Sequence, residues 1–548
     1  MKRDFRTISS KTFDVIVIGG GIVGAGVARD TTLRGLDTLL LEKEDFAYGT
    51  TSRSTRLIHG GLRYLRQLEF GLVRQDLSER EVLLRIAPHL VHPLAFLIPV
   101  HSTFLNVSMA LGTTLYDVIS FDRTLPSHKY LSRSKTLEWE PGLKVAHLQG
   151  SYVYYDCQIP YAERLNFETA LSAYENGATV INHARVTGLI REGDRIVGVE
   201  AKDELTGEVL RAKGKIIVDA AGHWVDLVKD MVFPNKPPYL RRTKGVHLLT
   251  PRVSDHALVL FSPRDGRLFF VIPWEGYSLV GTTDTDYKED LDAVYATRED
   301  VNYLLEGLHF AYPDIKIDDV FYTFAGLRSL ALRPGKSASD TSRSHELIDH
   351  SKRDGLDGLV TILGGKITAY RAVARDAADL VCRKMKYNTR CITAEKQLPG
   401  APAVNQDEIN QSSRESGLPV GAIRHLTSLY GTRYKEVLDM AKENPEGKLP
   451  LSPGGHDIIA QVWHAVKKES ACTLNDFMLR RSMVGLRPDQ GLDAFDKVAL
   501  EMQKLLRWSD EERQRQIQAF KSFMALGRRF TGAKAPDEYL LSGGTDRK

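Results

Sequence analysis

Short apolar runs that end at glycine-rich turns recur along the chain. They cover residues 13–18 (FDVIVI), 215–219 (KIIVD) and 359–363 (LVTIL), and a helical pattern follows each turn. A continuous apolar run of this length predicts a strand that is buried on both faces of a parallel sheet. The repeated order of strand, turn and helix therefore predicts an α/β fold.

The first of these turns has the features of a dinucleotide-binding fingerprint. Gly19 permits the tight turn, Gly21 lets a diphosphate approach the backbone, and Gly24 lets the next helix pack closely on the strand. The second strand, at 37–41, ends at Glu42, where an acidic side chain binds ribose hydroxyls. These features predict a nucleotide cofactor. They do not distinguish NAD from FAD, because both cofactors present the same ADP half.

Residues 48–65 have the composition of a segment that lies along a flat cofactor. A hydroxyl-rich first part is followed by the apolar pair Leu57 and Ile58, then by a histidine and two glycines. A solvated loop has no need of such an apolar pair. The later turns at 220–222 and 364–368 each lead into a helix, whose N-terminus would stabilise negative charge on a reduced flavin. These returns to the cofactor favour FAD.

The pattern changes beyond residue 395. A linker rich in proline, glycine and polar residues is followed by segments whose apolar and charged residues alternate at helical spacing. These segments are 419–430, 456–468, 473–484 and 492–508. They predict a helical C-terminal domain with a structural or interface role.

Charge and cysteine content exclude several classes of protein. The 74 basic and 70 acidic residues leave a net charge of +4, which is too small an excess to predict nucleic acid binding. It is compatible with an anionic substrate or an anionic membrane surface. The four cysteines lie far apart and form no CxxC pair, so we expect neither a disulfide framework nor a bound metal.

Hydropathy predicts no membrane-spanning helix, because no run of about 18 uncharged apolar residues occurs. The basic N-terminus leads into a strand rather than into a signal-peptide core, so we expect a cytoplasmic location. Residues 94–121 are nonetheless apolar, with His101 and Asp117 as their only acidic or basic side chains. A segment resting on a membrane and a buried core segment both fit this pattern. We expect a core segment.

Several motifs together make the chain resemble the FAD-dependent glycerol-3-phosphate dehydrogenase family, within the flavoproteins related to D-amino acid oxidase. The resemblance covers nearly the whole chain. It rests on residues 14–22 (DVIVIGGGI), 58–65 (IHGGLRYL), 79–81 (ERE), 244–247 (KGVH), 281–284 (GTTD), 325–328 (AGLR) and 364–368 (GGKIT).

The resemblance implies an FAD-binding, Rossmann-like α/β domain of the D-amino acid oxidase/glutathione reductase type, a β-rich substrate domain and an α-helical C-terminal cap. We expect residues 1–395 to form the FAD-dependent oxidoreductase region and residues 396–548 the helical domain. The expected FAD-binding segments are about 12–90, 150–245 and 320–395, interleaved with substrate-binding segments at about 91–149 and 246–319.

The turns and the resemblance together predict a set of FAD-binding residues. They are Gly19, Gly21, Ile22, Gly24, Glu42, Lys43, Thr50, Thr51, Ser52, Ser54, Leu57, Ile58, His59, Gly60, Val186, Ala221, Gly222, Gly326, Gly365, Lys366, Ile367 and Thr368.

A small phosphorylated substrate needs several cationic donors, among which arginine is preferred for bidentate contacts. The resemblance places Arg63, Arg328, Arg343, Lys366 and His247 in the substrate pocket, with hydroxyl donors from Tyr64 and Thr283. Oxidising an alcohol also requires a base of near-neutral pKa, which favours histidine. His59 is the first candidate and His247 the second. Arg328 and Lys366 would stabilise the developing alkoxide or hold the phosphate.

The resemblance implies oxidation of sn-glycerol 3-phosphate to dihydroxyacetone phosphate by hydride transfer to FAD, with electrons passed to a membrane quinone. It also implies peripheral attachment to the inner face of the cell membrane, and a homodimer stays open. Departures from the family pattern at 158–164 and Ser329 keep another polyol phosphate, such as erythritol phosphate, open as the substrate. An oxidase that uses O₂, a flavin-binding redox sensor and a soluble NAD-dependent dehydrogenase are competing hypotheses.

Overall fold

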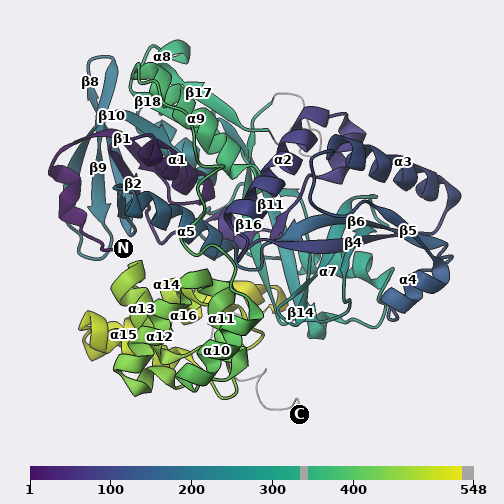
Figure 1. The fold of residues 1–548 in the computed structure, drawn as a ribbon. Helices are drawn as coiled ribbons and strands as arrows, with labels where there is room; N and C mark the ends of the chain where they lie inside the picture. The colour runs from purple at the N-terminus through teal and green to yellow at the C-terminus, as the bar shows by residue number, and fades with distance from the viewer. Residues whose placement is uncertain (334–343, 533–548) are drawn as a thin grey trace.

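Two β-sheets lie side by side, and a helical domain packs against both (Figure 1). The structure is a computed structural model that describes residues 1–333 and 344–532. Within these ranges, the side chains of Arg63 and Arg66 are not described.

The first sheet contains the three apolar runs as adjacent parallel strands, which confirms the predicted α/β fold. Its strand order is β17-β18-β10-β1-β2-β7, with the antiparallel pair β8 and β9 attached to β10. The bounds are β1 (Thr12–Ile18), β2 (Thr38–Leu41), β7 (Thr179–Ile181), β8 (Ala184–Glu192), β9 (Arg195–Asp203), β10 (Val209–Asp219), β17 (Glu346–Asp349) and β18 (Leu359–Leu363). The carboxyl ends of β1, β10 and β18 therefore meet at one edge, and their three glycine turns lie together there.

Helix α1 (Ile22–Leu33) packs between α5 (Ala162–Glu175) and α9 (Tyr370–Lys384). A Cβ added to Gly24, in the first turn of α1, would lie 1.9 Å from the carbonyl oxygen of Gly19. Only glycine therefore lets this helix begin so close to the turn, as the fingerprint predicts. Two short helices, α6 (Val225–Asp230) and α8 (His350–Arg353), follow β10 and β17.

The second sheet has the order β15-β11-β14-β13-β12-β4-β6-β3, with β16 paired to β11 and β5 to β6. The bounds are β3 (Leu57–Ile58), β4 (His92–Val100), β5 (Lys129–Ser132), β6 (Gly150–Gln158), β11 (Leu240–Pro251), β12 (Ala257–Phe261), β13 (Leu268–Trp274), β14 (Tyr277–Gly281), β15 (Thr285–Asp286) and β16 (Tyr322–Ala331). Strands β6 and β16 belong to this sheet although they lie in segments expected to bind FAD. Four helices accompany it: α2 (Phe70–Ile86), α3 (Thr103–Ile119), α4 (Arg133–Trp139) and α7 (Arg298–His309).

The expectation that residues 94–121 form a buried core segment is wrong for its second half. Strand β4 is buried from Phe96 to Val100, but only Thr113 and Tyr116 of α3 are buried. Helix α3 is apolar on more than one side, and a helix can press only one side against a sheet. Its other side is exposed at the edge of the molecule. In the described residues, no helix has both the length and the apolar composition needed to cross a bilayer.

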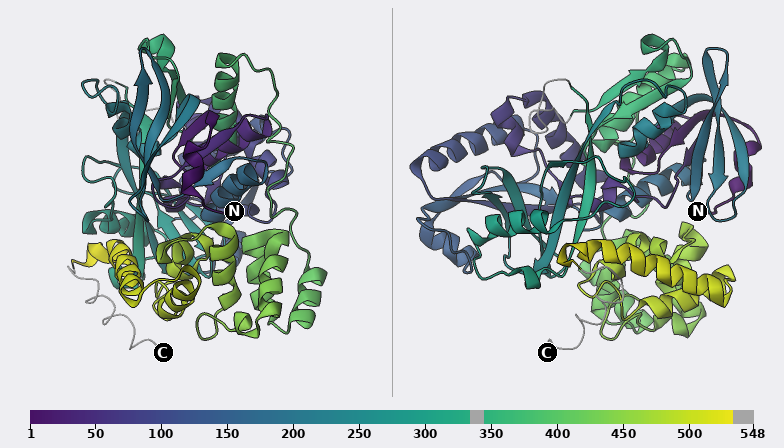
Figure 2. Two further views of the ribbon diagram at one scale, coloured as in Figure 1. Left: turned by 90° about the vertical axis from the view of Figure 1, so that its left-hand side faces the viewer. Right: turned by 180° about the vertical axis from the view of Figure 1, so that it is seen from behind.

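The C-terminal part is helical, as the sequence predicts, and lies beneath both sheets (Figure 2). The four expected segments contain α11, α13, α14 with a following π turn, and α15; α10, α12 and α16 are additional. The bounds are α10 (Gln406–Ser416), α11 (Val420–Tyr430), α12 (Tyr434–Glu443), α13 (Ile459–Glu469), α14 (Leu474–Asp476), α15 (Phe495–Leu506) and α16 (Asp510–Ala525).

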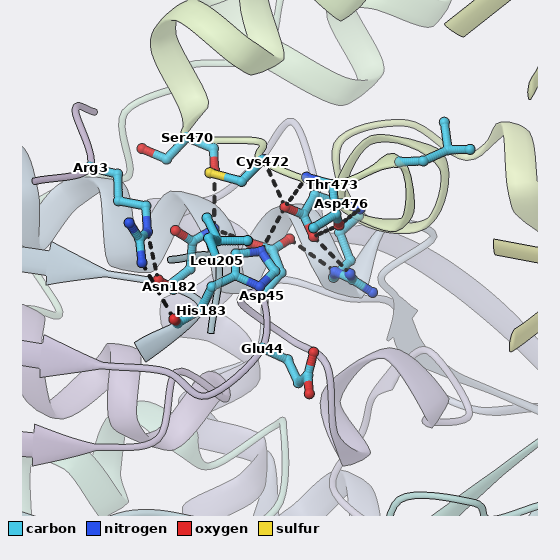
Figure 3. A network of polar contacts seen from close by, with 12 residues as sticks. Arg3, Glu44, Asp45, Asn182, His183, Leu205, Ser470, Cys472, Thr473 and Asp476 are labelled. Atoms are coloured by element: carbon cyan, nitrogen blue, oxygen red, sulfur yellow. Dashed lines mark hydrogen bonds and ion pairs between the residues drawn. The ribbon is translucent and has the colours of Figure 1, made fainter. Parts of the chain in front are cut away.

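Buried ion pairs join this helical domain to the first sheet. Arg481 donates to both carboxylate oxygens of Asp45, at 2.7 and 3.0 Å, and Arg480 donates to the same carboxylate at 2.9 Å. His183 and Asp476 meet beside them at 2.8 Å (Figure 3). Asp45, His183 and Asp476 lie close enough together to ligate a metal ion, but the arginines already neutralise the two carboxylates. We therefore interpret the cluster as a domain junction.

Candidate active site

A cavity of about 570 Å³ lies between the two sheets. It is lined by the glycine turns that follow β1, β10 and β18, and by residues of β11, β13 and β16 from the second sheet. This volume is typical of sites for cofactors and small ligands. The topology thus brings together three turns that lie hundreds of residues apart in the sequence.

Most of the residues predicted from the sequence line this cavity. They are Gly19, Gly21, Ile22, Glu42, Lys43, Thr50, Thr51, Ser54, Leu57, His59, Tyr64, Val186, Ala221, Gly222, His247, Gly326, Arg328, Gly365, Lys366, Ile367 and Thr368. Among the described residues, five predicted ones are not part of the lining: Gly24, Ser52, Ile58, Gly60 and Thr283. The hydroxyl of Thr283 is buried and accepts the backbone N–H of Val246 at 3.0 Å. The side chain of Arg63 and the whole of Arg343 lie outside the described residues.

The turn after β1 leaves room for a ligand. Gly19 has a φ of 106°, in the left-handed region that favours glycine. A Cβ added to Gly21 would have Thr51 Oγ1, at 3.6 Å, as its nearest neighbour, so this backbone is open toward the cavity. The carboxylate of Glu42 accepts the backbone N–H of Gly20 at 2.6 Å, and burial raises the pKa of Glu42. Glu42 therefore fixes the turn as well as lining the cavity.

A buried network supports the segment that carries His59. Asp156 on β6 accepts hydrogen bonds from Arg80 at 2.7 Å and from the Tyr116 hydroxyl at 2.7 Å. The Tyr116 hydroxyl in turn accepts the backbone N–H of Gly60 at 2.9 Å. A Cβ on Gly60 would lie 2.5 Å from this hydroxyl, so the network requires glycine at this position. The backbone next to His59 is thus held by partners from β6, α2 and α3.

The two candidate histidines have different surroundings. The ring of His59 packs edge-on against Phe270, with centroids 6.0 Å apart, and its backbone N–H donates to Thr368 Oγ1 at 3.1 Å. His247 is buried, with Nε2 2.9 Å from Thr55 Oγ1. Burial and the nearby guanidinium of Arg328 lower the pKa of His247 to about 3. His247 is therefore neutral near pH 7.

Three of the cations that line the cavity, Arg267, Arg328 and Lys366, contact carboxylates. Arg328 contacts Asp284 at 3.0 Å, and Arg267 contacts the same carboxylate at 3.0 Å, so two arginines share one negative charge. Lys366 pairs with the buried carboxylate of Asp76 on α2, and its ammonium lies 4.2 Å from the centre of the Tyr64 ring. Burial raises the pKa of Asp76 to about 6.

Comparison with known proteins fits this architecture. Residues 14–380 match the family described as FAD dependent oxidoreductase, and residues 391–513 match the C-terminal domain of alpha-glycerophosphate oxidase. A glycerol-3-phosphate dehydrogenase of Synechocystis sp. is 39% identical over 95% of this chain and 98% of its own length. The chain belongs to the FAD-dependent glycerol-3-phosphate dehydrogenase family.

Two further relatives of this family extend the comparison. The aerobic glycerol-3-phosphate dehydrogenase of Staphylococcus haemolyticus is 34% identical over 92% of this chain and 93% of its own length. The structure of the glycerol-3-phosphate dehydrogenase from Bacillus halodurans, complexed with FAD, superposes with a TM-score of 0.80 at 29% identity and covers 96% of this chain and 98% of that one. The comparisons confirm the fold class and the family that the sequence predicts.

FAD is the cofactor of this family, and the cavity fits it. The cradle has an open glycine backbone at Gly21, an acidic side chain at the end of β2, and the N-terminus of α1, where the Ile22 N–H donates to Thr51 Oγ1 at 3.1 Å. The N-terminus of a helix favours a bound phosphate. Residues of the turns at 220–222 and 364–368 line the same cavity.

Several residues of this cavity were not predicted from the sequence. They are Arg53, Thr55, Tyr154, His223, Trp224, Arg267, Phe270 and Thr282. Arg53 and Thr55 lie within the hydroxyl-rich segment at 48–65, whose composition was a usable signal. Phe270 and Arg267 carry no such signal, because strand pairing in the second sheet alone brings them to the cavity.

Proposed function

We propose that the protein oxidises sn-glycerol 3-phosphate to dihydroxyacetone phosphate with FAD as the hydride acceptor, and that the electrons pass to a membrane quinone. The names of its relatives support this substrate. The observation that carries the proposal is that the glycine turns line one cavity together with His59, His247, Arg267, Arg328 and Lys366. Bound FAD supplies the site that takes the hydride from the alcohol carbon.

His59 is the proposed general base. It would take the hydroxyl proton as the carbon–hydrogen bond gives its electron pair to the cofactor, which leaves a ketone. A base works best when its pKa lies near the working pH. The pKa of His247, at about 3, makes its ring a weak proton acceptor. We therefore propose that His247 hydrogen-bonds the substrate as a neutral ring, because its buried Nδ1 has no partner among the described residues.

Arg328 and Arg267 are the proposed phosphate-binding pair. Both line the cavity, and both contact the carboxylate of Asp284 at 3.0 Å. A phosphate monoester carries nearly two negative charges and is bound well by guanidinium groups. Arg63 and Arg343 stay predicted phosphate ligands from the sequence, and Lys366 is proposed to stabilise the developing alkoxide.

Of the two departures from the family pattern, only one lies at the cavity and bears on the choice among polyol phosphates. None of residues 158–164 is among the described residues that line the cavity, and the Gln158 side chain donates to the carbonyl of Pro273 at 2.8 Å. Arg164 pairs with Glu469 of the helical domain at 2.9 Å. This departure from the family pattern therefore concerns packing. Ser329 does line the cavity and keeps erythritol phosphate as the alternative substrate.

Anaerobic bleaching of the bound flavin tests the proposal. Glycerol 3-phosphate should reduce the flavin faster than erythritol 4-phosphate, and glycerol without a phosphate should not reduce it. If glycerol 3-phosphate leaves the flavin oxidised, the proposed substrate is wrong. Reoxidation by a quinone analogue without stoichiometric hydrogen peroxide would support a dehydrogenase, whereas stoichiometric peroxide would identify an oxidase.

A further inference from the structure

Asp76 is a buried carboxylate of helix α2 that lies directly behind the wall of the cavity. It is not among the described residues that line the cavity, but it pairs with the ammonium of Lys366, and Lys366 does line it. The same ammonium lies 4.2 Å from the centre of the Tyr64 ring. A carboxylate and an aromatic face each attract a cation. Together they fix the Lys366 ammonium at the cavity wall.

Two neighbouring buried carboxylates are bound more completely than Asp76. One turn further along α2, Glu79 accepts hydrogen bonds from Arg371 with both of its oxygens. Asp156 of β6 also accepts hydrogen bonds with both oxygens. Among the described residues, Oδ1 of Asp76 has no hydrogen-bond partner. A buried carboxylate oxygen without a partner costs stability, so packing alone does not account for a charge at this position.

We propose that Asp76 is a positioning residue of the reaction, which compensates the charge of Lys366 while it holds the ammonium as a hydrogen-bond donor at the cavity wall. The proposal rests on the proposed function, in which Lys366 stabilises the developing alkoxide. Asp76 acts through Lys366 and touches neither the substrate nor the cofactor.

The pairing limits how strongly the cavity attracts negative charge. An ammonium at the wall favours every anion in the cavity, including a phosphate group and a reduced flavin. A carboxylate behind the ammonium weakens this attraction but leaves its N–H groups in place. With Asp76 ionised, the bound flavin should therefore have a lower reduction potential, and anions should bind more weakly, than with Lys366 uncompensated.

The charge of Asp76 changes within an accessible pH range. The described titratable side chains around the pair come from five elements: Lys366 of the 364–368 turn, Glu79 of α2, Asp156 of β6, Tyr116 of α3 and Tyr64 of the 3₁₀ helix η3 (Leu62–Gln67). Burial raises the pKa of Asp76 and Lys366 lowers it, which leaves it at about 6. Asp76 is therefore ionised above about pH 7 and protonated below about pH 5.

The variant Asp76→Asn of the FAD-loaded, full-length protein tests the proposal. At pH 8 it should raise the equilibrium constant for flavin reduction about tenfold, or about 30 mV for a two-electron couple. It should also bind inorganic sulfate about three- to tenfold more tightly, because Lys366 is no longer compensated. Equilibration with a reference dye measures the potential, and perturbation of the flavin absorbance measures sulfate binding. Both differences from the wild type should vanish below about pH 5, where the wild type is protonated at Asp76.

Two controls separate this role from a structural one. Glu79→Gln removes a buried carboxylate from the same helix, but its partner Arg371 is not among the described residues that line the cavity. This variant should keep the wild-type potential and sulfate affinity. In a Lys366→Met background, Asp76→Asn should change neither quantity, because the cation through which it acts has been removed. If Asp76→Asn retains no FAD, Asp76→Ser removes the same charge with a smaller side chain and should give the same shifts.

Three results would overturn the proposal. They are a wild-type potential and sulfate affinity in the neutral variants of Asp76, equal shifts in Glu79→Gln, and shifts that persist in the Lys366→Met background. Neither the potential nor sulfate binding depends on the identity of the alcohol. Flavin bleaching by glycerol 3-phosphate is measured separately, so its failure would refute the substrate and leave the role of Asp76 standing.

Discussion

At the scale of single residues, the cavity separates two histidines by their surroundings. His247 is buried beside Arg328, which keeps its ring neutral, whereas His59 packs against Phe270. Both line the same cavity. Their predicted roles differ accordingly, with proton transfer assigned to His59 and hydrogen bonding to His247.

Replacing the two histidines should therefore slow flavin reduction to different extents. His59→Ala should slow anaerobic flavin reduction by about 10²- to 10⁴-fold, because it removes the base, with little change in the dissociation constant for glycerol 3-phosphate. His247→Gln keeps a neutral hydrogen-bonding group and should slow reduction far less. Stopped-flow absorbance of the flavin measures both constants. A larger rate loss in His247→Gln would reverse the assignment.

A second prediction at the scale of single residues concerns Asp76 and the pH dependence of stability. Burial raises its pKa from 3.8 to about 6 in the folded protein. Between these values the native state holds a proton that the unfolded chain has released, so the contribution of Asp76 to stability falls as pH rises from about 4 to about 6. The shift corresponds to about 3 kcal/mol of unfolding free energy.

Asp76→Asn should abolish this dependence of the unfolding free energy on pH. The difference in unfolding free energy between wild type and variant, from urea denaturation at several pH values, should change between about pH 4 and 6 and be flat above that range. Lys366→Met offers a check, because Lys366 lowers the pKa of Asp76. Its removal should move the upper limit of the pH window above 6. A difference that stays constant from pH 4 to 8 would contradict the assignment.

At the scale of elements, the short strand β3 and its turn depend on packing against three other elements. Gly60 fits between Tyr116 of α3 and Leu77 of α2, and both α2 and β6 supply the buried network beneath it. An added Cβ would meet Tyr116 Oη at 2.5 Å and Leu77 Cδ2 at 2.6 Å. The turn that carries His59 therefore has little freedom to move.

Gly60→Ala should destabilise the fold by about 1–3 kcal/mol through overpacking, and it should weaken FAD retention because the turn must shift. Gly71→Ala is the control, since an added Cβ there meets nothing within 4 Å and the residue lies in helix α2. That change should be neutral or slightly stabilising. Thermal unfolding and flavin content after gel filtration measure both effects. Equal behaviour of the two variants would show that the turn tolerates the shift.

At the scale of the whole molecule, the helical domain is joined to the cofactor-binding sheet by buried charges. Asp45 follows Glu42 and Lys43 of the cavity lining by only a few residues, and its carboxylate is held by Arg480 and Arg481. The loop that follows β2 therefore supplies both the cavity lining and the junction with the helical domain.

Breaking the junction should cost more than breaking a surface pair. Arg481→Met should lower the unfolding free energy by about 3–5 kcal/mol, because it leaves part of the charge on Asp45 buried without its partner. Arg390→Met removes an exposed pair with Glu395 and should cost about 1 kcal/mol or less. Urea denaturation gives both values, and flavin release during the same titration should come earlier for Arg481→Met. Similar costs for the two variants would contradict a structural role of the junction.

The sequence by itself determined the local units of this protein. Strand, glycine turn and helix are encoded by neighbouring residues, so β1 with Gly19, Gly21 and Gly24, and the later runs at β10 and β18, are all readable from hydrophobic pattern and turn chemistry. Because all three are parallel strands of one sheet, their turns had to meet at one edge. The family motifs then supplied the candidate residues, most of which line the cavity.

Only the tertiary structure decided which distant groups meet and which faces stay uncovered. Lys366 and Asp76 are 290 residues apart and Asp45 and Arg481 are 436 apart, so no local pattern links them. Helix α3 is apolar on several sides, and periodicity does not say which side the sheet covers. Burial, pKa and exposure depend on neighbours that the folded topology provides. These properties distinguish the two histidines and leave an apolar side of helix α3 at the surface.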